Sequence, residues 1–219
     1  MFRDIHRNIE YFNDYIKYEE SRICKYVKKL SEIPDNKRDL CNTFIASSLK
    51  NKLTAQYSRG DTKEEIKDTF FEYLNYVSKT QIKSYIEYID ILSLGILFDI
   101  EFGKIETFVI EEDLKDSLTK GLEQYLKTKK IEITDEDVLF PKEFKEFYNY
   151  LVGKKDKGEF LSFIKNSWYM SCTDFYWFDS HNSKEDIYAG YWSWLGAAIL
   201  KMKDDKLNEI IQYIPSELI

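Results

Sequence analysis

The chain has 219 residues, of which 43% are hydrophobic and 32% are charged. This balance allows a packed core and excludes an intrinsically disordered chain. The net charge of −7, from 39 acidic and 32 basic residues, argues against nucleic acids and anionic membranes as partners. Most of the acidic excess lies in residues 131–219, where it fits either a solvated surface or an acidic docking face.

Three cysteines, Cys24, Cys41 and Cys172, are an odd number and lack the spacing of a metal site. We therefore interpret them as free thiols in a reducing compartment. The N-terminal residues lack the apolar core of a signal peptide, and no apolar run reaches the length of a membrane-spanning helix. Both observations lead us to expect a cytoplasmic protein.

The first part of the chain predicts three helices in succession. Apolar residues recur at helical spacing from Arg3 to Leu30, which indicates a long first helix with a charged outer face. A second helix follows from Leu40 and ends at Gly60. The third begins immediately afterwards, because Thr62 and Glu65 have the spacing of a capping box.

The stretch Ser183–Met202 predicts the central helix of the core. Ser183 can cap it, and Asp186 stands three residues later, where a capping box has its acidic partner. The remaining pattern is apolar around nearly the whole circumference, as in a buried helix. Several glycines and alanines in this stretch would let neighbouring backbones approach closely.

A second apolar helix is predicted over Gln81–Phe102. Aligning Tyr88 with Tyr191 brings the apolar residues of the two buried helices into register. This alignment suggests that the chain consists of two related halves, each built around one buried helix. A chance likeness between two apolar helices explains the pattern nearly as well.

The other segments complete an all-α fold, since none shows the period-2 alternation of a strand. Further helices are expected over 113–126, from Pro141 to Gly153, over 160–168 and over 207–213, with a polar linker at 128–137 and an aromatic, acidic connector at 173–182. The fold predicted is a helical bundle of about eight helices arranged as hairpins. We divide it into an N-terminal region, 1–128, and a C-terminal region, 129–219, packed together as one unit.

The residues give little sign of catalysis. His6 and His181 are the only histidines, and neither stands in a recognisable nucleophile setting. There is no zinc, calcium or phosphate-loop motif, so we expect no metal and no cofactor. We therefore predict a protein that binds rather than an enzyme, with no catalytic residues.

Three motifs occur in the chain: YSRGD at 57–61, ILSLGILFDI at 91–100 and YAGYWSW at 188–194. Their order and spacing resemble those of the PoNi immunity proteins, and the likeness covers nearly the whole chain. Leu195 and Gly196 depart from that pattern, which has an acidic residue followed by a small one. The departure at Leu195 would affect local packing.

The resemblance implies an antidote to a bacterial DNase toxin of the PoNe type, used in competition between cells. Such a protein would bind the basic nuclease domain of its cognate toxin and block the active site. An acidic helical surface is suited to a cleft that binds phosphates. Candidate contacts are acidic and aromatic residues of the C-terminal part, although core burial is the commoner role of the aromatics: Asp135, Glu136, Asp137, Tyr176, Trp177, Asp179, Glu185 and Asp186.

Two other functions stay open at this point. The first is an all-helical adaptor for protein–protein interaction that has no nuclease partner. The second is a small helical hydrolase or ribonuclease that uses His6 or His181. The sequence leaves the oligomeric state and the identity of the toxin open.

Overall fold

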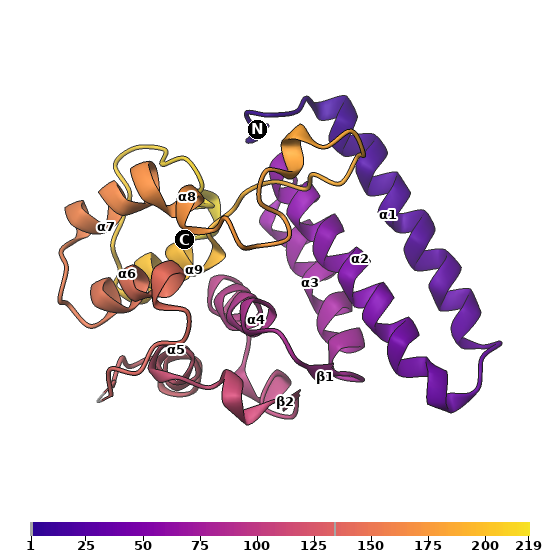
Figure 1. The fold of residues 1–219 in the computed structure, drawn as a ribbon, viewed down its shortest axis with the longest axis horizontal. Helices are drawn as coiled ribbons and strands as arrows, with labels where there is room; N and C mark the ends of the chain where they lie inside the picture. The colour runs from indigo at the N-terminus through magenta and orange to yellow at the C-terminus, as the bar shows by residue number, and fades with distance from the viewer. Residues whose placement is uncertain (1, 134) are drawn as a thin grey trace. The chain divides into compact units, whose positions relative to one another are not determined.

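The structure is a computed structural model that describes residues 2–133 and 135–219. Its helices fall into two compact units (Figure 1). Unit 1 comprises the chain up to Gln81 together with Asp179–Tyr191, and unit 2 comprises Ile82–Phe178 and Trp192–Ile219. The predicted division at residue 128 stays a prediction. Of the predicted linker 128–137, residue 134 lies outside the described residues.

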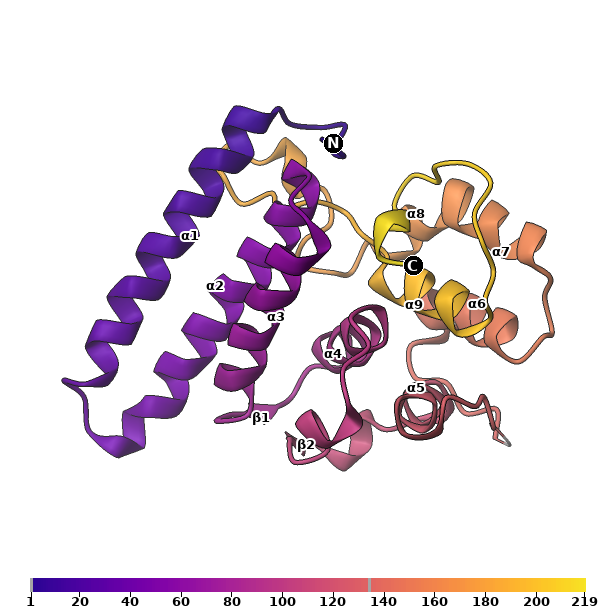
Figure 2. The same ribbon diagram turned by 180° about the vertical axis from the view of Figure 1, so that it is seen from behind.

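Unit 1 is built on three helices, α1 (Ile9–Leu30), α2 (Arg38–Arg59) and α3 (Lys63–Val77). A short 3₁₀ turn, Asp35–Lys37, joins the first two. Figures 1 and 2 show α2 lying between the other two helices, which it contacts on opposite sides. Apolar side chains from all three fill the space between them: Phe12, Ile16, Ile45, Leu49, Leu53, Ile66 and Phe70.

Both signals predicted at the junction of α2 and α3 are confirmed. Gly60 ends α2 in the left-handed region, with φ of 101°, and its N–H donates to the carbonyl of Gln56. The Thr62 hydroxyl accepts from the backbone N–H of Glu65, and the Glu65 carboxylate accepts from the N–H of Thr62. The reciprocal pair satisfies two of the free N–H groups at the start of α3.

The first helix begins later than predicted, at Ile9 rather than Arg3. Asn8 caps it by accepting from the backbone N–H of Tyr11 at 2.9 Å. Upstream, the carboxylate of Asp4 accepts from the backbone N–H groups of His6 and Arg7, which holds the chain in a turn. Residues 2–8 therefore form a non-helical N-terminal arm.

Unit 2 has α4 (Tyr85–Leu97) packed against α9 (Trp194–Met202) and α5 (Ser117–Thr128). The helix α6 (Pro141–Leu151) contacts α9 and α7 (Lys157–Phe163). A π-helical turn, Ile164–Trp168, and α8 (Tyr169–Ser171) continue α7 without a break. Two-residue strands, β1 (Gln81–Ile82) and β2 (Val109–Ile110), pair in the only sheet found among the described residues. The predicted all-helical bundle of about eight helices is confirmed.

The largest correction concerns Ser183–Met202, which is not one helix. Only Trp194–Met202 is helical, and its cap is Ser193, whose hydroxyl accepts from the N–H of Gly196. Ser183 accepts from the N–H of Glu185 within a non-helical turn. Gly190 has φ of 128°, a conformation that no helix contains. Of the residues before 194, Tyr188, Tyr191 and Ser193 are buried by tertiary contacts instead, and 184–187 are exposed.

The two apolar helices do not each centre one half of the chain. Both α4 and α9 belong to unit 2, where they pack against each other. Tyr88 lies in α4, whereas Tyr191 lies outside any helix and belongs to unit 1. The two compact units therefore do not correspond to halves with one apolar helix each, and the relation between two halves stays a prediction.

The remaining predicted helices differ mainly at their ends. The helix expected over 81–102 covers Tyr85–Leu97, and the one expected over 113–126 covers Ser117–Thr128. The helix from Pro141 ends before Gly153 as predicted, and Gly153 has φ of 77°. No helix forms over 207–213, where Tyr213 is left-handed and the chain packs as a loop.

We predict that Gly60→Ala lowers the free energy of unfolding by about 1 kcal/mol, because a Cβ is unfavourable at left-handed φ. Gly103→Ala is the control, since its Cβ would meet only Glu106 Oε1 at 3.6 Å. Urea denaturation of both variants checks this. Equal midpoints for the two variants would contradict the prediction.

Candidate functional site

The acidic run Asp135–Asp137 lies in unit 2, between α5 and α6, with all three residues exposed. Its backbone is anchored, because the carbonyl of Asp135 accepts from the Tyr148 hydroxyl at 2.7 Å and that of Asp137 from the Ser117 N–H at 2.9 Å. The Glu136 carboxylate forms an ion pair with Lys154, which lowers the pKa of Glu136.

The two predicted aromatic contacts also belong to unit 2. Tyr176 is 76% exposed, so it is free of the core role that most tyrosines of this chain have. Trp177 is half-buried and lies beside Trp168, with ring centroids 5.9 Å apart. Of these two aromatics, Tyr176 therefore presents much the larger surface to a partner.

The remaining predicted residues share one stretch of unit 1, Asp179–Tyr191, which we call the acidic segment. Asp179, Glu185 and Asp186 are all exposed in it, and Ile187 beside them is 50% exposed. Asp179 is left-handed, with φ of 59°, and its side chain accepts from the amide of Asn182 at 2.7 Å. The segment thus presents three carboxylates and one apolar side chain on backbone that is irregular apart from the 3₁₀ turn Ser180–Asn182.

The acidic segment is held on the helices by hydrogen bonds to its own backbone. The Tyr11 hydroxyl accepts from the N–H of Tyr188 at 3.1 Å and donates to the carbonyl of the same residue at 2.9 Å. The Ser58 hydroxyl donates to the carbonyl of Ala189 at 2.7 Å. Burial raises the pKa of Tyr11 to about 12, so this hydroxyl keeps its proton at neutral pH.

The N-terminal arm, residues 2–8, supplies the second set of anchors. The guanidinium of Arg7 donates to the carbonyl of His181 at 2.5 Å. The hydroxyl of Tyr188 donates to the buried carboxylate of Asp4, also at 2.5 Å. Each end of the acidic segment therefore contacts the arm.

The only two histidines of the chain meet at this junction. The rings of His6 and His181 lie against each other at a tilt, with centroids 4.2 Å apart and planes at 36°. The Tyr191 hydroxyl accepts from the backbone N–H of His181 at 3.0 Å and lies 2.8 Å from Nδ1 of the same residue. Sequence reasoning considered each histidine alone and did not predict that they pair.

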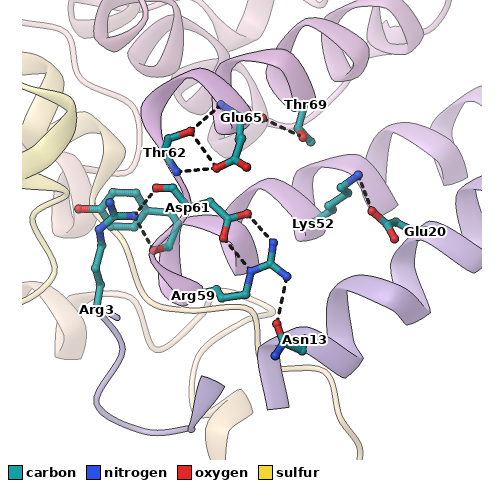
Figure 3. A network of polar contacts seen from close by, with 10 residues as sticks. Arg3, Asn13, Glu20, Lys52, Arg59, Asp61, Thr62, Glu65 and Thr69 are labelled. Carbon is teal, nitrogen blue, oxygen red and sulfur yellow. Dashed lines mark hydrogen bonds and ion pairs between the residues drawn. The ribbon is translucent and has the colours of Figure 1, made fainter. Parts of the chain in front are cut away.

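The arm is itself fixed to the junction of α2 and α3 (Figure 3). The Arg3 guanidinium donates to the carbonyls of Tyr57 and Asp61 at 2.9 and 3.1 Å. Arg59 binds the Asp61 carboxylate through two nitrogens, at 2.7 and 2.6 Å, and also reaches Asn13 on α1. Arg59 therefore braces the junction of α2 and α3 against α1.

Two of the three motifs on which the resemblance rests meet in unit 1. Ser58 belongs to the 57–61 motif and Ala189 to the 188–194 motif, and their hydrogen bond joins residues 131 positions apart. Tyr11, Asp4 and Arg7 complete the contact, but no local pattern marks them in the sequence. The arrangement is a rigid support for an acidic surface.

The described part of the chain brings no three His, Cys, Asp or Glu side chains together as a metal site would require. Cys172 is buried, and burial raises the pKa of its thiol to about 12. Its thiol is therefore a poor nucleophile at neutral pH. No helix in the described residues has the length and apolar character needed to cross a bilayer.

Two family models match the chain. A model of the N-terminal domain of PoNe immunity proteins (PoNi) matches residues 3–109, and a model of their C-terminal domain matches residues 114–218. No curated protein and no solved structure gave a significant match.

We predict that Tyr11→Phe lowers the free energy of unfolding by about 1–3 kcal/mol, because it leaves the buried N–H and carbonyl of Tyr188 without their partner. Hydrogen exchange at the Tyr188 amide should accelerate. Tyr176→Phe is the matched control, because Tyr176 is exposed, and it should leave both measurements unchanged. An unaltered Tyr188 amide in the Tyr11 variant would contradict this role.

Proposed function

This chain belongs to the family of PoNe immunity proteins (PoNi), and we propose that it binds and neutralises a cognate PoNe-type DNase toxin. Two family models that together span residues 3–109 and 114–218 are the observation that carries the proposal. The protein would act in the cytoplasm, as a stoichiometric inhibitor without turnover. It would protect the cell that makes it from the toxin of a competitor.

The charge of the chain supports this mechanism. A DNase must offer a basic cleft to the phosphates of its substrate. A protein with net charge −7 is attracted to such a cleft, and opposite charges speed the encounter of two proteins. Occupation of the cleft would exclude DNA from the active site.

The acidic segment of unit 1 offers one set of contacts for the toxin. Asp179, Glu185 and Asp186 are exposed there, while hydrogen bonds from the arm and the helices hold the backbone beneath them. A surface that is already ordered loses less conformational entropy on binding. Ile187, half exposed beside the acids, could supply apolar contact area.

Unit 2 offers a second set. Asp135 and Asp137 are exposed, and Tyr176 is the exposed aromatic of the predicted contacts. Tyrosine is frequent among the residues that dominate interface energies, because it combines a large apolar ring with a polar hydroxyl. Glu136 is already paired with Lys154, so binding would have to compete with that ion pair.

We predict that co-expression of this protein protects a host cell from the PoNe-type nuclease encoded beside its gene. The two purified proteins should form a complex, and added DNA should stay intact in a nuclease assay when the inhibitor is present at one to one or above. The complex should weaken as salt rises, because screening reduces the attraction between opposite charges.

Two outcomes would contradict this proposal. Host death despite equal expression, with no complex at low salt, would exclude neutralisation of that nuclease. Capture of a partner that is not a nuclease would instead favour an adaptor.

We predict that the triple substitution Asp179→Asn, Glu185→Gln and Asp186→Asn weakens toxin binding by about tenfold or more, chiefly through slower association. Substituting Asp135→Asn and Asp137→Asn tests the unit 2 contacts in the same way. Association and dissociation rates from surface-based kinetics are the measurement.

The control removes the same amount of charge elsewhere, through Glu32→Gln and Asp35→Asn at the exposed turn between α1 and α2 and Asp39→Asn in the first turn of α2. It should change binding by less than about twofold. If it weakens binding as much as the first triple substitution, overall charge and not the acidic segment determines the affinity.

A further inference from the structure

The paired histidines add a ring contact between the N-terminal arm and the acidic segment, beside the Arg7–His181 and Asp4–Tyr188 hydrogen bonds. His6 belongs to the arm and His181 to the segment, 175 positions further along the chain, yet their ring centroids are 4.2 Å apart. Edge contacts with Tyr188 and Tyr191 enclose the pair, with centroids 5.7 and 5.5 Å from that of His6. The two imidazole rings therefore lie in one environment that the two tyrosines partly enclose.

His181 is bound to the same tyrosine that borders His6. The Tyr191 hydroxyl accepts from the backbone N–H of His181 at 3.0 Å and lies 2.8 Å from Nδ1 of that residue. Asp179 lies 3.8 Å from Nδ1, but it is exposed and also bound to Asn182.

The surroundings of His6 are unfavourable to a positive charge on its imidazole. Its Nε2 is buried and makes no hydrogen bond within the described residues. Arg7, next in the chain, already places a guanidinium at the carbonyl of His181. Asp4 is the nearest opposing charge, but its carboxylate oxygens already accept from two backbone N–H groups and the Tyr188 hydroxyl.

Protonation of either ring would place a cation against the other ring and beside Arg7. Two charged imidazoles at this separation repel each other, and the partial burial of both rings reduces the screening of that repulsion by water. The rings share the contact between the arm and the segment with the Arg7–His181 and Tyr188–Asp4 hydrogen bonds. Charge on the pair would therefore weaken that contact.

We propose that the His6–His181 pair is a pH-sensitive latch. It keeps the acidic segment packed against the arm and the helices of unit 1 at neutral pH, and it releases the segment on acidification. Both histidines of the latch lie in the described residues, and its opening requires a change of protonation but no ligand. The consequence for toxin binding rests on the function proposed above, because it requires the docked segment to be a contact surface.

The direction of the pH dependence follows from His6. Burial lowers the pKa of His6 below its ordinary value of 6.5, the neighbouring His181 and Arg7 lower it further, and Asp4 opposes them. A group with a lowered pKa in the folded state stabilises the fold above its unfolded pKa. That contribution is complete above about pH 6.5 and is lost as the pH falls through the folded pKa of His6.

Hydrogen exchange of the full chain at pH 7.5 and 5.5, corrected for the intrinsic rate, tests the latch. Carboxylates keep their charge at both values, since their ordinary pKa is about 4. In the wild type, we expect the acidic segment and the arm to lose protection at pH 5.5, while α4 in unit 2 keeps it. His6→Phe retains a flat ring that cannot be protonated, so its segment should stay protected at both values.

His6→Ala removes the ring and should expose the segment at both pH values. Equal protection of the wild-type segment at pH 7.5 and 5.5, or the same loss in His6→Phe, would overturn the latch. If the variants fail to fold, the proton NMR titration of the wild-type imidazoles decides. A measured pKa of 6.5 or above for His6 also overturns the latch.

The affinity for the PoNe-type nuclease separates this inference from the proposed function. We expect the affinity to fall at pH 5.5 for the wild type and to change less for His6→Phe. Absence of any complex with the nuclease would refute the proposed function, while the exchange experiment would still decide the latch. If the segment opens at pH 5.5 but the affinity for the nuclease does not change with pH, the latch plays no part in toxin binding.

Discussion

The constraint that shapes unit 1 is that buried backbone must find hydrogen-bond partners. The acidic segment has one 3₁₀ turn, Ser180–Asn182, and few backbone hydrogen bonds of its own, so side chains from elsewhere serve its other buried N–H and carbonyl groups. The Tyr11 hydroxyl serves both backbone groups of Tyr188, and the Ser58 hydroxyl serves the carbonyl of Ala189. Arg7 does the same for His181. The position of the segment depends on these few side chains.

The same contacts connect stability with function. Side chains that satisfy the buried backbone also hold Asp179, Glu185 and Asp186 in place on the outside. An ordered acidic surface is attracted to a basic nuclease and loses little entropy when it binds. The His6–His181 pair adds a ring contact, and the proposed latch would make its strength depend on pH in the range where imidazole titrates. Folding of the segment and its proposed use therefore rely on one set of interactions.

Much of the helical framework could be predicted because its signals are local. Gly60 ends α2 in the left-handed conformation, and the capping box of Thr62 and Glu65 starts α3, as their spacing indicates. The start of α1 was missed because Asp4 competes for backbone N–H groups that a longer helix would have used. Of the candidate site, the acidic and aromatic residues were found from charge and composition, and their role in binding stays a prediction. The side chains that position them carry no local signature.

The sequence by itself determined the helical class, the end of α2 and the start of α3, the acidic balance and the family, since each depends on composition or on residues close together in the chain. The tertiary structure decided how the buried residues of Ser183–Met202 are covered. Its apolar spacing fits a helix, yet Tyr188 is bound by Tyr11, 177 positions away. Periodicity records that a side chain is buried but not what buries it. The pairing of His6 with His181 was likewise decided only by folding, because the two residues are far apart in the chain.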